Sequence, residues 1–85
     1  MKTCLFHKGK MLPAFTLPFA PAIQSEWRLR VRKGSASEAM ILSSCNADTL
    51  KPVAGTDFVD VFFKINSIWF HELKGWIADC EQVVK

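Results

Sequence analysis

The chain of 85 residues is long enough for one small domain, and its 49% hydrophobic content, with seven Phe and three Trp, excludes a disordered protein. Eleven basic and eight acidic residues leave a net charge of +3, an excess too small to indicate nucleic-acid binding by itself. No apolar stretch reaches the roughly 18 residues that a membrane-spanning helix needs, so we expect no membrane partner.

The N-terminal residues 1–25 are predicted to be an extended, proline-containing segment, and residues 26–85 are predicted to be the compact core of a single domain. Residues 3–7 are largely apolar and precede a Lys-Gly-Lys turn, which indicates a short strand. Pro13, Pro18 and Pro21 then remove backbone donors and favour extended backbone. We expect this stretch to cross the core as an irregular edge strand.

Residues 26–33 carry the clearest strand pattern in the chain. Three arginines, Arg28, Arg30 and Arg32, alternate with three apolar residues, so one face of this strand is basic and the other apolar. The sequence KGSAS follows as a turn, and residues 38–45 are predicted to return as the second strand of a hairpin. Residues 46–57 contain several turn formers and are predicted to be a loop.

The C-terminal residues from Trp69 onward are predicted to form an amphipathic helix. Seven apolar residues fall on one arc at helical spacing: Trp69, Leu73, Trp76, Ile77, Cys80, Val83 and Val84. We expect Trp69, Leu73, Trp76 and Cys80 to lie in the core. Residues 57–65 alternate as a strand does, yet they also continue the helical phase, so one long helix over 57–84 is the alternative.

The predicted fold class is therefore α+β. A small antiparallel sheet of three or four strands, with one C-terminal amphipathic helix packed on it, is the simplest way to bury both apolar stripes. The alternative combines the long C-terminal helix 57–84 with a β-hairpin.

The arginine face is the first candidate binding site. Neighbouring side chains on one face of a strand lie about 6.6 to 6.8 Å apart, a spacing near that of successive phosphates in a nucleic acid. Arg28, Arg30, Arg32 and Lys33 are thus candidates for contact with an acidic protein surface or with nucleic acid. A solvated strand face that blocks edge-to-edge aggregation explains the same pattern without any partner.

The second candidate site is apolar. Ten aromatic residues are more than one helix on a small sheet readily covers, and uncovered apolar patches on small proteins usually mark interfaces. Phe63 and Ile68 lie off the main helical stripe and, with Phe70, are candidates for a homodimer interface.

Catalytic and metal-binding motifs are incomplete. Cys4 and His7 form half of a zinc pattern, but the second pair of ligands is missing, and His71-Glu72 lacks the second histidine of a zinc-protease motif. We expect no enzyme activity, no metal and no cofactor. Three cysteines without a C-x-x-C pair are typical of reduced thiols in a cytoplasmic protein, and secretion after cleavage near Ala22 is the alternative.

These observations predict a non-enzymatic protein-protein interaction protein, such as an adaptor, an inhibitor or an assembly subunit. The expected partner is another protein, possibly one with an acidic surface, and self-association as a homodimer is expected. The alternative is a nucleic-acid-binding module that uses the arginine face.

Overall fold

The computed structural model describes residues 2–85, except for the side chains of residues 13–16. The strands are β1 (Thr3–His7), β2 (Lys10–Leu17), β3 (Glu26–Arg32), β4 (Lys51–Pro52), β5 (Phe58–His71) and β6 (Gly75–Val83). One α-helix, α1 (Ala36–Leu42), and one short 3-10 helix, η1 (Ala47–Thr49), lie between β3 and β4.

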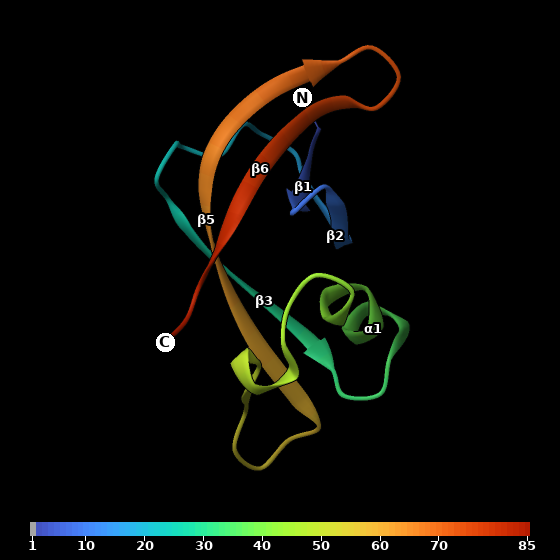
Figure 1. Ribbon diagram of the computed structural model, residues 1–85, viewed down its shortest axis with the longest axis vertical. Coiled ribbons are helices and arrows are strands. Elements are labelled where there is room, and N and C mark those ends of the chain that lie inside the picture. The colour runs from blue at the N-terminus through green and yellow to red at the C-terminus, as the bar shows by residue number, and fades with distance from the viewer. Residues whose placement is uncertain (1) are drawn as a thin grey trace.

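The six strands form one sheet in the order β2-β1-β6-β5-β3, with β4 pairing with β5 off this path. β1 and β6 run parallel, and the other pairs are antiparallel. The long β5 pairs with β3 over residues 58–64, with β4 at residues 59–60 and with β6 over residues 62–71. Figure 1 shows the sheet curling, with the β5–β6 hairpin at one end of the molecule. The prediction of a small antiparallel sheet carrying a C-terminal helix is therefore wrong.

Residues 36–42 form the helix α1, so the prediction of a strand over residues 38–45 is also wrong. The Ser35 side chain caps this helix by accepting a hydrogen bond from the backbone N of Glu38 at 3.2 Å. The Glu38 carboxylate in turn accepts one from the backbone N of Gly34 at 3.0 Å, much as in a capping box. α1 contacts β2 and β3, the two edge strands, and buries Ile41 between them.

The C-terminal residues form the β5–β6 hairpin, and neither C-terminal helix predicted from the sequence, from residue 69 or over 57–84, exists. Phe62 to His71 of β5 pair with Gly75 to Val83 of β6, and residues 72–74 make the turn. Gly75 has φ of 80°, a conformation that glycine adopts without strain. A register shift between Ile65 and Ser67 bends the hairpin.

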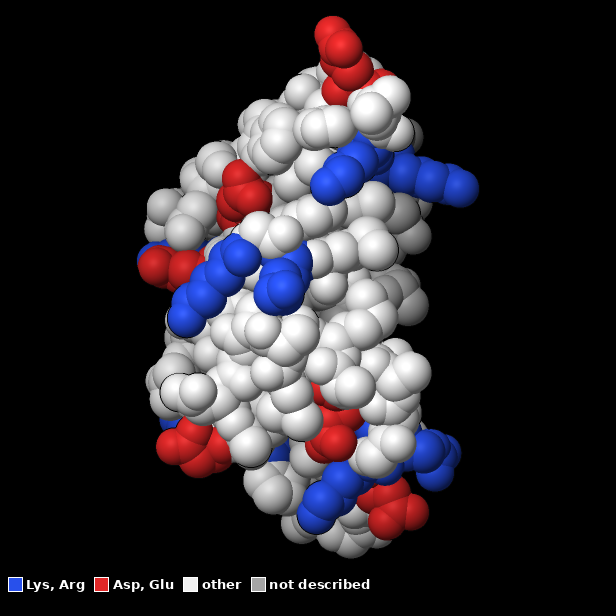
Figure 2. Space-filling model, turned by 45° about the vertical axis from the view of Figure 1, so that its right-hand side comes forward, with Lys and Arg blue, Asp and Glu red and all other residues white. Residues whose placement is uncertain are grey.

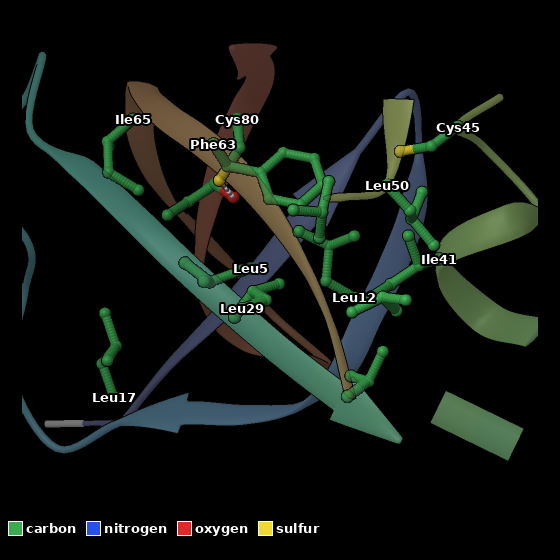
Figure 3. Packing of buried hydrophobic residues seen from close by; sticks show 14 residues of the cluster. Leu5, Leu12, Leu17, Leu29, Ile41, Cys45, Leu50, Phe63, Ile65 and Cys80 are labelled. Atoms are coloured by element: carbon green, nitrogen blue, oxygen red, sulfur yellow. Dashed lines mark hydrogen bonds between the residues drawn. The ribbon is translucent and has the colours of Figure 1, made fainter. Parts of the chain in front are cut away.

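The hydrophobic core lies on the concave face of the sheet and is closed by α1. Phe63 has no exposed surface and occupies the centre of the cluster, as Figure 3 shows. Leucines and β-branched residues from the strands, from α1 and from the end of η1 belong to the same cluster: Leu5, Leu12, Leu17, Leu29, Ile41, Leu50, Val61 and Ile65. Burial of such side chains stabilises the fold by about 25 cal/mol for each Å² of apolar surface removed from water.

The N-terminal segment belongs to the same packed unit. β1 lies inside the sheet between β2 and β6, and Leu5, Leu12 and Leu17 all contribute to the core cluster. β2, which contains Pro13, is an edge strand. Proline is tolerated in edge strands because a nitrogen on the open side has no neighbouring strand to bond. Cleavage near Ala22 would remove both strands from the sheet.

His7 connects β1 to the residues that follow α1. Its Nδ1 lies 2.8 Å from Ser44 Oγ and 3.5 Å from Cys45 Sγ, and its ring packs edge-on against Phe63. Burial of the imidazole, with the nearby Lys8 charge, lowers the pKa of His7 below its ordinary value. Burial also raises the pKa of the Cys45 thiol. This pair therefore favours two neutral groups and lacks the thiolate of a cysteine nucleophile.

The buried His7 is expected to make stability depend on pH. Because its pKa is lower in the folded than in the unfolded chain, the unfolded chain binds more protons at acidic pH. The free energy of unfolding should be highest above the ordinary histidine pKa of about 6.5 and should fall as the pH drops below it. Urea unfolding between about pH 5 and pH 8 should show a weaker fall for His7→Asn than for the parent. An identical fall in both proteins would contradict this role.

Candidate functional site

Four large apolar side chains are exposed together at the end of the β5–β6 hairpin. Leu73 is 91% exposed, Phe70 59%, Trp69 41% and Trp76 37%. We call these four residues the tip patch. They occupy the last residues of β5, the turn and the first residues of β6. Clusters of exposed apolar residues on small proteins are typical of interaction sites.

The aromatic members of the tip patch lie on both faces of the hairpin. Phe70 and Trp76 are directly paired across the two strands, and their rings meet edge to face with centroids 5.5 Å apart. Trp69 points to the opposite face, where its indole Nε1 donates a hydrogen bond to Asp79 Oδ2 at 2.6 Å. Each ring is therefore held in one orientation while a large part of its surface stays in solvent.

The turn that carries Leu73 is ordered by hydrogen bonds from its backbone to the His71 side chain. The backbone N atoms of Leu73 and Lys74 donate to Nδ1 of His71 at 3.1 and 3.2 Å. Gly75 closes the turn at positive φ. Because the backbone of the turn is already ordered, it loses little conformational freedom when a partner covers Leu73, which favours binding.

The arginine face on β3 is largely occupied by contacts within the chain. Arg30 forms a two-point ion pair with Asp60 on β5, with N–O distances of 2.7 and 2.9 Å. The Arg32 guanidinium lies 5.0 Å from the centre of the Phe58 ring. Arg28 is exposed beside Arg30, and its charge also helps to lower the pKa of Asp60. Figure 2 shows charges of both signs in small groups separated by uncharged surface on the face in view.

The Arg30–Asp60 pair is expected to contribute to stability. Asp60 is buried, and the hydrogen bonds from Arg30 are the main reason that its pKa lies below the ordinary value. Arg30→Gln leaves this carboxylate with a weaker partner and should lower the free energy of unfolding. Arg28→Gln, the matched control on the same strand, should change the free energy of unfolding by less than about 0.5 kcal/mol. Equal losses in the two variants, measured by urea unfolding, would contradict a structural role specific to Arg30.

The remaining candidate residues are placed in different parts of the molecule. Phe63 is completely buried at the centre of the core, so its side chain is not available on the surface of this fold. Ile68 is partly buried and packs against the core cluster. Lys33 is exposed after β3, and its backbone N donates to the carbonyl of Asp57 at 2.7 Å. Phe70 alone among the predicted apolar residues lies in the tip patch.

Neither a metal-binding cluster nor a membrane-spanning helix is present in the part of the chain that the structure describes. Within residues 2–85 no three His, Cys, Asp or Glu side chains come together as a group that could hold a metal ion. Cys4 and His7, which form half of a zinc pattern in the sequence, lie on opposite faces of β1: His7 contacts Cys45, and Cys4 lines a pocket on the other face. No helix among these residues is long and apolar enough to cross a membrane.

Comparisons with known proteins identify no relative. No family model, no curated protein sequence and no solved structure matches this chain.

Proposed function

We propose that this chain is a non-enzymatic interaction protein that binds another protein through the tip patch, as an adaptor, an inhibitor or a subunit of an assembly. The observation that carries the proposal is the exposure of Trp69, Phe70, Leu73 and Trp76 on one ordered hairpin. Covering them removes apolar surface from water, and aromatic residues dominate the energetics of protein interfaces.

A second copy of the chain is the first partner that we propose. The exposed apolar residues of the hairpin end, beside the charged turn residues Glu72 and Lys74, would be the same on both copies. Two-fold symmetric pairs, in which one surface meets its own copy, are the commonest oligomers. Edge-to-face contacts such as the one between Phe70 and Trp76 can also form between rings of two molecules. Self-association would cover on each copy the surface that the monomer leaves in water.

The arginine face gives less support to the alternative of nucleic-acid binding or to an acidic partner. Arg30 is engaged with Asp60 and Arg32 stacks on Phe58, so only part of the basic stripe is available for a phosphate or a carboxylate. Binding to nucleic acid would require breaking these contacts or using Arg28 and Lys33 alone.

Sedimentation velocity of the purified chain tests the proposal for a second copy. Between about 1 and 100 µM, where contacts of moderate affinity become populated, the average mass should rise from that of the monomer toward twice that value. A monomer throughout this range would contradict self-association, and the tip patch would then have to bind a different protein.

A further inference from the structure

A pocket lies on the outer face of the sheet, away from the hydrophobic core. It has a volume of about 460 Å³ and is lined by Cys4, Phe6, Gly9, Met11 and Lys74. Four of these residues come from the β1–β2 hairpin, and the fifth reaches over from the turn between β5 and β6. The volume falls within the range of about 300 to 1,000 Å³ that is typical of small-molecule sites.

The floor of the pocket is apolar without being part of the core. Phe6 is buried and points to the outer face, and neither it nor Ile77 on the neighbouring strand β6 belongs to the core cluster. Met11, which is half exposed, stands at the side of the pocket and has a flexible thioether that adapts to the shape of a ligand. A side-chain carbon added at Gly9 would meet no atom within 4 Å, so the pocket is open there.

The charge in the pocket comes from Lys74. Its ammonium lies 5.2 Å from the centre of the Phe6 ring, so the cation is held over the apolar floor. None of the five lining residues is acidic, and the ion pairs found among the described residues involve Arg30, Lys64 and Lys85 rather than Lys74. A cation above an aromatic floor without a carboxylate partner is complementary to an anion attached to an apolar body.

We infer that this pocket binds a small amphipathic carboxylate, with an acyl chain or an aromatic ring against Phe6 and Met11 and its carboxylate at Lys74. The apolar body supplies most of the affinity by leaving water, and Lys74 selects the anion over a neutral molecule of the same shape. Of the pocket residues, Lys74 alone lies in the hairpin turn beside the tip patch, and the other four come from the β1–β2 hairpin.

Octanoate and 1-octanol are suitable probes, because they have the same chain length and differ in the charge of the head group. Titration followed by two-dimensional NMR should give saturable shifts at Cys4, Phe6, Gly9 and Met11, with octanoate binding about three- to tenfold more tightly than octanol. Lys74→Gln should remove this difference, and Lys51→Gln, which replaces an exposed lysine on β4, should preserve it.

Three outcomes would overturn the inference. They are shifts that do not saturate, shifts confined to residues outside the pocket, and equal affinity of the parent protein for the two probes. Sedimentation of Met11→Ser separates this site from the proposed contact between copies. Met11 lines the pocket from β2 and is not part of the β5–β6 hairpin, so the substitution should weaken octanoate binding and leave self-association unchanged. The experiments can therefore contradict ligand binding at the pocket while supporting self-association through the tip patch, or the reverse.

Discussion

Phe63→Ala should lower the free energy of unfolding by about 3 to 5 kcal/mol, the usual cost of removing a large aromatic side chain from a close-packed core. Phe63 is fully buried among the side chains of β1, β2, β3 and α1, and its ring contacts His7. Because Phe63 has no exposed surface, the cavity that its removal leaves is closed off from solvent. A loss of this size is a large fraction of the total stability of a small domain.

Trp76→Ala is the control that separates this fold from a helical one. A C-terminal helix would bury Trp76 and make its removal as costly as that of Phe63. In the hairpin Trp76 is more than one third exposed and packs mainly on Phe70, so its loss should cost about 1 to 2 kcal/mol. Urea unfolding measures the free energy of unfolding of both variants.

If Phe63→Ala does not fold, Phe63→Leu should still fold and lose less than about 2 kcal/mol. A larger loss for Trp76→Ala than for Phe63→Ala would refute the packing described here.

Replacing Phe70 and Leu73 together by serine should abolish self-association. Both side chains are more than half exposed, so the substitutions remove contact area with little effect on the monomer. Loss of two apolar residues from the centre of an interface typically weakens binding by about 100-fold or more. Sedimentation velocity should then show only monomer at concentrations where the parent protein associates.

Ile23→Ser with Val84→Ser is the matched control for this experiment. These two residues are also exposed and apolar, but they lie outside the tip patch. The control variant should associate as the parent does. If it loses association to the same extent, the contact depends on general surface hydrophobicity and not on the hairpin.

Strand β3 could be predicted from the sequence because its two faces differ in polarity. Arg28, Arg30 and Arg32 face water while Leu29 and Val31 enter the core, and this alternation leaves one interpretation. The pairing of Arg30 with Asp60 could not be predicted, since the two residues are 30 positions apart and meet only through the register of β3 and β5.

The helix α1 was missed because its apolar residues suit a short strand equally well. The signal that identifies it is the sequence Ser35-Ala-Ser-Glu38, in which a capping serine precedes glutamate by three residues. The unbroken apolar run Met40, Ile41 and Leu42 is compatible with a buried strand as well as with a short helix, so periodicity alone does not separate the two.

The C-terminal hairpin was mistaken for a helix because both of its faces are apolar near the turn. Trp69 and Ile77 lie on one face and Phe70 and Trp76 on the other, so no alternation of polarity remains to identify strands. Leu73, in the turn, happens to be spaced from Trp69 and Trp76 as residues on one face of a helix are. Gly75 was the available turn signal. The prediction that Trp69, Leu73 and Trp76 lie in the core is therefore wrong, and these three residues belong to the tip patch. Of the four predicted core residues, Cys80 alone is buried.

Cross-linking from position 73 tests the central claim, that the tip patch is the contact surface, most directly. A benzophenone amino acid in place of Leu73 would lie at the most exposed point of the patch. Irradiation of the purified protein should join two copies, and mass spectrometry should locate the new bonds at residues 69–76 of the second copy. Cross-links that form only within one chain, or that join position 73 to β3 or α1 of another copy, would contradict the claim.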